Sequence, residues 1–197
     1  MIQAAVLNVN SSNLQNIFRE QGVIVSNVLS QEMISLDFQK KSIFVPPIYR
    51  SPQLDYVFKL LVEKSSSGFS LEQQGLSVII RTQLGHTILT LWNMQQQQTV
   101  AMASLSQVSL SQTKSVLQAC GMVEVNRYHC LTLLYNIEEL QTVFALCEWR
   151  ERTTFLYITS FSETFLIEAL AKIHISMDVI RYYTYQQLCT LYKVPAI

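Results

Sequence analysis

The sequence predicts an α/β fold with a mixed, mainly parallel central sheet flanked by helices. From Arg127 to Tyr192, apolar and β-branched runs alternate with capped amphipathic segments, as in the strand–helix units of a parallel sheet. The run from Thr153 to Thr159 carries no charge, which is typical of a strand covered on both faces. We therefore expect a C-terminal βαβαβα order, with an additional antiparallel hairpin in the N-terminal half.

The organising core of this prediction is the C-terminal stretch of residues 127–193. Asn136 and Glu139 have the spacing of a capping box, and the apolar residues that follow recur at three- and four-residue steps. This pattern predicts a helix that ends near Arg150. The expected elements are strands at 127–135, 153–159 and 177–183, and helices at 136–150, at 162–173 and from 184 onward.

The N-terminal half mixes strand-like and helical patterns. Ser51 followed by Pro52 is a strong helix start, because serine caps the helix and proline suits its first turn. For residues 100–105 the periodicity does not distinguish a strand from a helix. The expected elements are strands at 2–9, 23–29, 33–38 and 42–45, helices from 12, from 51 and at 111–120, and a hairpin formed by 77–83 and 86–92.

A chain of 197 residues is expected to form a single α/β domain spanning residues 1–197. The serine-rich stretch at residues 65–68 ends in glycine and is the best candidate for a mobile loop or a boundary. It would set off an N-terminal subregion of residues 1–67.

The composition indicates a surface poor in charge. Charged residues make up 14% of the chain and hydrophobic residues 49%, with a formal net charge of zero. Globular domains usually carry about 25% charged residues. Because large uncharged surfaces often mark contacts, we expect a protein partner or a homo-oligomer. Lysines and arginines are scattered along the chain, so the charge pattern does not favour nucleic acid as the partner.

The sequence indicates an intracellular protein, cytoplasmic or nuclear, with no membrane contact. It lacks the pattern of a signal peptide and has no run of about 18 apolar residues. The cysteines lie in apolar surroundings without CxxC spacing, which predicts buried free thiols in a reducing compartment. They are Cys120, Cys130, Cys147 and Cys189.

No recognisable catalytic, cofactor or metal motif occurs. The five glycines are dispersed, so neither GxGxxG nor GxxxxGK[ST] is present, and no cofactor is predicted. Each histidine stands alone, without the spacing of metal ligands. His129 and Cys130 are adjacent, but adjacent side chains of a strand point to opposite faces. We expect no catalytic residue and no metal site.

Two sets of residues are candidates for contacts with partners. Trp149 lies among charged residues, and tryptophan and arginine are favoured interface anchors. Packing of Trp149 onto a neighbouring strand is the alternative. The candidates for protein contact are Trp149, Arg150, Arg152 and Trp92. The candidates for nucleic-acid contact, where tyrosine rings could stack on bases, are Arg127, Lys172, Arg181, Tyr182, Tyr183 and Lys193.

Together these features predict a non-catalytic interaction protein, a subunit or adaptor of a larger multi-protein assembly that uses an uncharged surface. One alternative is an accessory nucleic-acid-associated subunit with a nucleotide-type fold that lacks a phosphate-binding loop. The other is an enzyme whose site is assembled from residues distant in the sequence. That alternative requires a concave pocket with perturbed titrating groups.

Overall fold

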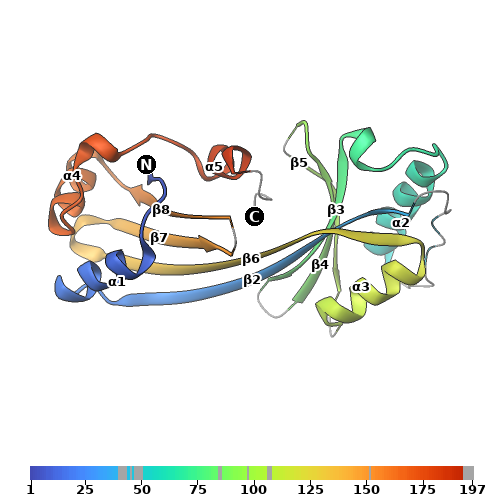
Figure 1. The fold of residues 1–197 in the computed structure, drawn as a ribbon, viewed down its shortest axis with the longest axis horizontal. Helices are drawn as coiled ribbons and strands as arrows, with labels where there is room; N and C mark the ends of the chain where they lie inside the picture. Colours follow the sequence, from blue (N-terminus) through green and yellow to red (C-terminus); the bar gives the residue numbers. More distant parts are fainter. Residues whose placement is uncertain are drawn as a thin grey trace. The chain divides into compact units, whose positions relative to one another are not determined.

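The computed structural model describes residues 1–39, 44, 46, 51–83, 86–96, 98–105, 108–150 and 152–192. The chain forms two compact units (Figure 1). Unit 1 comprises residues 1–30 and 129–197, and unit 2 comprises residues 31–128. Two long strands, β2 (Val25–Phe38) and β6 (Met122–Ile137), have residues in both units.

The strands are hydrogen-bonded in the order β1-β8-β7-β6-β2-β3-β4-β5, and the described pairings are antiparallel. The prediction of a mainly parallel sheet with a C-terminal βαβαβα order is therefore wrong. The physical reason is the length of the connections. Parallel strands need a crossover of a dozen or more residues, whereas only short turns join β6 to β7 and β7 to β8.

Unit 1 is a sheet in the order β1-β8-β7-β6 with helices on it. Its strands besides β6 are β1 (Ile2–Val6), β7 (Thr142–Trp149) and β8 (Thr153–Ser160). Its helices are α1 (Ser11–Glu20), α4 (Glu163–Lys172) and α5 (Tyr185–Leu191), with short 3-10 helices η2 (Glu138–Leu140) and η3 (Met177–Val179).

Residues 136–150 do not form the predicted helix. After η2, Gln141 adopts a left-handed conformation with φ 43°, and the chain returns as strand β7. Phe144 and Leu146 are buried on one face of β7, while Cys147 is buried on the other. A strand that is covered on both faces can match helical spacing by chance, and this one does.

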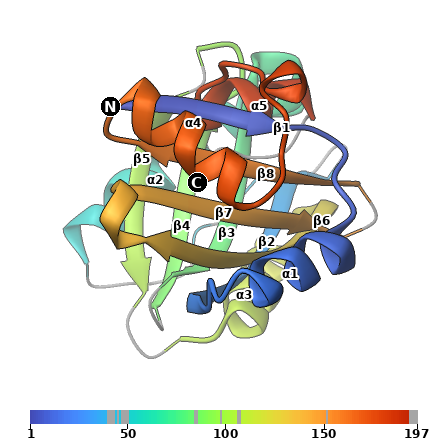
Figure 2. The same cartoon turned by 90° about the vertical axis from the view of Figure 1, so that its left-hand side faces the viewer.

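One face of the unit 1 sheet is covered by α1 and α4 (Figure 2). Phe18 of α1 stacks on Tyr135 of β6 at a ring-centroid distance of 4.0 Å and lies 5.4 Å from the ring of Phe144. From α4, Leu166 and Leu170 join the same core. The N-cap of α4 is Ser162, whose hydroxyl accepts a hydrogen bond from the backbone N–H of Phe165. The predicted 162–173 helix is therefore confirmed.

Aromatic residues of the last helix pack against strand β8. The ring of Phe155 stacks on Tyr192 at 5.7 Å, and the ring of Tyr157 meets Tyr185 edge-on at 5.6 Å. The capping box at Thr184 is present, so the predicted C-terminal helix is confirmed as α5.

Unit 2 packs two helices against its own strands. The helices are α2 (Pro52–Ser65) and α3 (Leu110–Ala119), and the strands besides β2 and β6 are β3 (Leu76–Gln83), β4 (His86–Asn93) and β5 (Gln98–Leu105), with a 3-10 helix η1 (Glu72–Gln74). Buried residues of α2, including Val57 and Leu61, form one core with β2 to β5 and α3. The predicted helices and the β3–β4 hairpin are confirmed here, and residues 100–105 are strand.

Two further local predictions are corrected, and a third is not tested. The expected strands 23–29 and 33–38 are parts of one strand, β2. The expected strand at 177–183 instead contains η3 and a single bridge between Arg181 and Ala5. The expected strand at 42–45 lies largely outside the described residues. Among the described helices, none is long and apolar enough to span a membrane.

Substitution within α4 tests the core of unit 1. We expect Leu170→Ala to lower the free energy of unfolding by about 2–5 kcal/mol, because Leu170 is fully buried and its truncation leaves a cavity. Ile167→Ala in the same helix is the matched control, since Ile167 is 46% exposed. It should change stability by less than about 1 kcal/mol. Urea unfolding measures both variants, and equal losses would contradict the packing described here.

Candidate ligand-binding pocket

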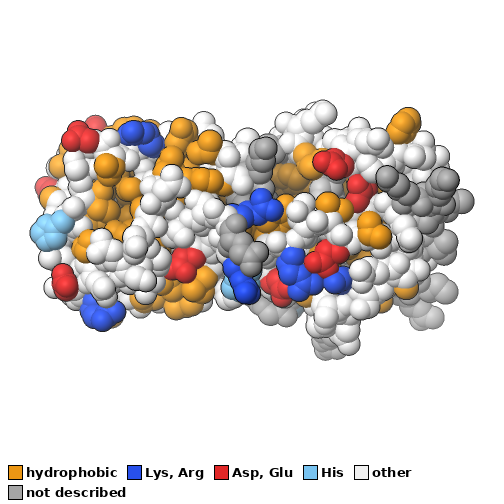
Figure 3. All heavy atoms as spheres, in the orientation of Figure 1, with side chains coloured by type: hydrophobic (Ala, Val, Ile, Leu, Met, Phe, Trp, Pro, Cys, Tyr) orange, Lys and Arg blue, Asp and Glu red, His pale blue; other side chains and the backbone are white. Residues whose placement is uncertain are grey.

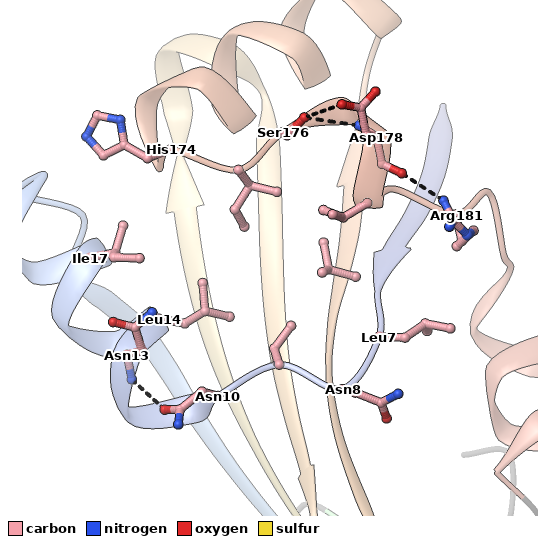
Figure 4. A pocket seen from close by; sticks show the side chains of 14 residues that line it. Leu7, Asn8, Asn10, Asn13, Leu14, Ile17, His174, Ser176, Asp178 and Arg181 are labelled. Carbon is pink, nitrogen blue, oxygen red and sulfur yellow. Dashed lines mark hydrogen bonds between the residues drawn. The ribbon is translucent and has the colours of Figure 1, made fainter.

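A pocket of about 600 Å³ lies in unit 1, between segments far apart in the sequence (Figure 4). One wall is formed by residues 6–10 and by α1. The other is formed by the chain that follows α4, up to Arg181. The lining residues are Val6, Leu7, Asn8, Val9, Asn10, Asn13, Leu14, Ile17, His174, Ile175, Ser176, Asp178, Val179 and Arg181.

The first wall is shaped by two asparagines. Asn8 has φ 52°, a left-handed conformation that asparagine tolerates better than most residues. This residue ends the extended course of β1, and Val9 then donates its N–H to the carbonyl of Thr154 at 3.1 Å. Asn10 caps α1, since its side-chain oxygen accepts the N–H of Asn13 at 2.9 Å.

The second wall begins where α4 ends. His174 has φ 57°, which turns the chain back so that Ile175 donates its N–H to the carbonyl of Leu170 at 3.0 Å. Ser176 then caps η3: its hydroxyl accepts the N–H of Asp178 at 3.3 Å and donates to the carboxylate Oδ2 at 3.1 Å. Polar side chains at both turns therefore hold this wall in place.

Arg181 joins the two walls at the end of the pocket. Its backbone N–H donates to the carbonyl of Ala5 at 2.9 Å, and the N–H of Ala5 donates to the carbonyl of Arg181 at 2.8 Å. One guanidinium nitrogen, Nη1, donates to the carbonyls of Asp178 and Ile180 at 3.0 and 2.8 Å. The Arg181 side chain is thus fixed at the rim, and Asp178 supplies a charge of the opposite sign.

The pocket combines an apolar interior with a polar rim. In Figure 4, Leu14 and Ile17 point toward the middle, whereas Asn8, His174 and Arg181 lie around the edge. The hydroxyl of Ser176 is engaged by Asp178, and Nε2 of His174 lies 3.0 Å from Nε2 of Gln21. Neither side chain is paired as a nucleophile and its base would be.

The structure brings together no set of metal ligands in the part of the chain that it describes. The cysteines there are free thiols, with Cys130, Cys147 and Cys189 buried and Cys120 partly exposed. Burial raises the pKa of Cys189 to about 12, so its thiol stays protonated at neutral pH. His129 faces the hydroxyl of Ser30 at 3.3 Å rather than a thiol.

The predicted protein-contact residues do not line this pocket. Trp149 is only 3% exposed, so its side chain packs in unit 1 instead of standing at the surface. Arg150 and Arg152 are exposed beyond the end of β7, and the N–H of Arg152 donates to the carbonyl of Trp149. Trp92 is half-buried on β4 of unit 2.

The predicted nucleic-acid residues are dispersed. Arg127 is tied to Glu124 and Glu32 in unit 2, and Lys172 donates to Glu139 at 2.6 Å in unit 1. Among the candidates that the structure describes, only Arg181 lines the pocket. Tyr182 is exposed and Tyr183 half-buried in the stretch before α5, while Lys193 lies outside the described residues. On the face drawn in Figure 3, charged side chains are sparse, with hydrophobic side chains between them.

No sequence motif marks the pocket. Its only local signal is the run from Asn8 to Asn13, where asparagines recur before and inside the first helix. Asparagine favours left-handed turns and helix caps, so this run could have indicated a shaped turn. It could not have indicated the opposite wall.

Comparison with known proteins finds no matching family model and no matching curated protein. Solved structures do match. The PH1012 protein from Pyrococcus horikoshii OT3 is 11% identical, with 95% of this chain and 98% of that chain covered and a TM-score of 0.46. A candidate adenylyl cyclase from Hippeastrum, reported to have a dominant triphosphatase activity, is 10% identical, with coverages of 98% and 97% and a TM-score of 0.46. A candidate adenylate cyclase from Vibrio parahaemolyticus is 14% identical, with coverages of 96% and 98% and a TM-score of 0.41.

These neighbours contradict the prediction of a non-catalytic subunit or adaptor, since several are named for cyclase or triphosphatase chemistry. That prediction is withdrawn. The nucleic-acid alternative is withdrawn as well, because it relied on a nucleotide-type fold with a mainly parallel sheet, whereas the described strand pairings are antiparallel. At such identities and TM-scores, the likenesses assign no activity to this chain.

The ion-pair cluster around Arg127 gives a pH-dependent prediction. Hydrogen bonds from Arg127 and then Lys114 lower the pKa of Glu124 from 4.5 to about 2. A depressed carboxyl pKa stabilises the fold above pH 4.5, and this contribution is lost as the pH falls toward about 2. Glu124→Gln should therefore cost about 1 kcal/mol at pH 7 and nothing below pH 2.

Denaturant unfolding at both pH values measures this difference. Glu168→Gln, at an exposed position of α4, is the control and should have little effect at either pH. A loss from Glu124→Gln that persists unchanged at the acidic end would contradict the assignment.

Proposed function

We propose that unit 1 binds a small amphipathic ligand of no net charge in the pocket between β1, α1 and η3. The observation that carries this proposal is the pocket itself. Its volume of about 600 Å³ lies within the range of roughly 300–1,000 Å³ that small-molecule sites occupy. Such sites combine apolar side chains with placed polar groups, and here the lining residues are half apolar and half polar.

The rim indicates the polarity of the ligand. Asp178 and Arg181 contribute one charge of each sign, which favours a neutral or zwitterionic molecule over an anion or a cation. Asn8, Asn10 and Asn13 add side-chain amides that can donate and accept hydrogen bonds. A suitable ligand therefore presents both donors and acceptors on one side.

The apolar residues in the interior of the pocket indicate that the other side of the ligand is apolar. Leu14 of α1 is buried, whereas Val179 of η3 is 47% exposed although it lines the pocket. A ligand that covers Val179 would remove apolar surface from water, at about 25 cal/mol per Å². The proposal concerns binding alone, and we assign no catalytic step to the described lining residues.

Two probes test this function in ¹⁵N-labelled protein: N-acetyl-L-leucinamide and maltose. We expect at least one of them to shift backbone amide signals of residues 6–10 and 174–181, with a Kd in the millimolar range. N-acetyl-L-leucinamide has about a dozen non-hydrogen atoms and gains about −0.3 kcal/mol from each, or about −4 kcal/mol in all, which corresponds to a millimolar Kd. Titrations in which neither probe shifts these signals would contradict the proposal.

A large side chain that fills the pocket should prevent the probes from binding there. Val179→Trp places a large side chain at an exposed position of the wall, so we expect at least a tenfold loss of affinity without loss of fold. Ile167→Trp on α4 is the matched control, because Ile167 is equally exposed but does not line the pocket. NMR titration and a thermal unfolding curve are measured for both. Equal affinities of the two variants would place binding elsewhere.

A further inference from the structure

The edge of β1 that faces away from β8 already pairs with backbone. Ala5 and Arg181 exchange two hydrogen bonds there, at 2.8 and 2.9 Å, in an antiparallel bridge. This is the geometry with which an added strand would continue along β1. The bridge stops after a single residue pair.

Alternation along the strand identifies the next backbone groups at this edge. Ala5 exchanges its bonds with Arg181 on the side away from β8, and the backbone groups of successive residues point to alternate sides of a strand, so the N–H and C=O of Leu7 face the same side as those of Ala5. By the register of the bridge, the partner of Leu7 would be Val179. However, Val179 belongs to η3 and donates its N–H to the carbonyl of Ser176 at 3.3 Å instead.

Leu7 therefore has an open backbone edge in the pocket wall. Neither its N–H nor its C=O is bonded to any residue in the described part of the chain. Both Leu7 and Val179 line the pocket, so the space between them is where a partner strand is missing. Unpaired strand edges are the usual sites of strand addition by peptides.

We propose that the ligand of this pocket is a short, uncharged peptide segment that adds to β1 at Leu7 as an extended strand; this inference rests on the function proposed above. Asn8 turns the chain away directly after Leu7, so the edge accommodates only about two or three residues at roughly 3.3 Å each.

The side-chain environment fits such a segment. Strand addition places alternate side chains into pockets, which gives specificity, while the backbone bonds give affinity. The apolar interior around Leu14 and Ile17 can receive one aliphatic side chain. Because Asp178 and Arg181 balance each other, a charged segment gains no advantage. A peptide ligand also gives a concrete form to the protein partner that the low charge content predicts.

The test uses the full chain, labelled with ¹⁵N, and the blocked tripeptide Ac-Ala-Leu-Ala-NH₂. We expect the tripeptide to shift the amide of Leu7 and to slow its hydrogen exchange at least tenfold at saturation. An analogue methylated at its backbone nitrogens should bind at least tenfold more weakly, because it cannot donate to the carbonyl of Leu7. Equal binding of the analogue would overturn strand addition.

A pair of variants separates the backbone from the side chain. Leu7→Pro removes the N–H, which carries no bond to a described residue, and proline is tolerated at a strand edge. We expect it to lose at least tenfold in affinity. Leu7→Ala keeps the N–H and should bind the tripeptide at least fivefold more tightly than Leu7→Pro does. Equal affinities of the two variants would overturn the inference; where Leu7→Pro does not fold, the methylated analogue decides.

The outcomes also separate this inference from the proposed function. Pocket shifts with maltose or N-acetyl-L-leucinamide, but not with the tripeptide, would overturn the peptide assignment and leave ligand binding intact. If none of the three probes shifts the amide signals of the pocket, both the proposed function and the peptide assignment are overturned.

Discussion

The antiparallel pairing of β7 with β6 and β8 is the interaction on which the rest of unit 1 depends. It places Phe144 and Leu146 on one face, where α1 and α4 cover them, and Cys147 on the other. Because β8 in turn pairs with β1, the same ladder puts Ala5 and Leu7 at the sheet edge. The open edge is thus the outer side of β1, the last strand in this order.

Pocket formation depends on the ends of elements rather than on their middles. Asn8 and His174 both take left-handed conformations, and Asn10 and Ser176 both act as caps. These turns bring residues 6–10 and 174–181 into one wall each, and the Ala5–Arg181 bridge holds the two together. A rigid frame with polar turns around an apolar interior is the usual construction of a binding site.

The sequence correctly predicted those elements that depend on local interactions, such as helix caps. The caps at Ser162 and Thr184 form the bonds that their spacing indicates, and the helices that follow them exist. The failure at residues 136–150 has a physical cause. Phe144 and Cys147 lie on opposite faces of a covered strand, so their three-residue spacing imitates a helix, and only pairing with β6 and β8 decides the conformation.

The pocket could not be predicted from the sequence, for a similar reason. Trp149 was predicted to be a contact residue because its neighbours in the sequence are charged, but its side chain is buried. Charged neighbours in the sequence do not show whether a residue is exposed. Leu7 and Val179 carry no motif, and their importance arises only because η3 diverts the chain from a bridge between distant segments. Arg181 was predicted as a contact residue because of its charge, and it does lie in the pocket wall. What places it there, however, is its backbone bridge to Ala5.

Native-state amide hydrogen exchange in the free protein tests the central claim most directly, that β1 has a paired edge at Ala5 and an open one at Leu7. The Ala5 amide donates to Arg181 and should be strongly protected, while the Leu7 amide should exchange orders of magnitude faster. Comparable protection of both amides would mean that the chain itself already fills this edge. That result would remove the basis for a ligand there.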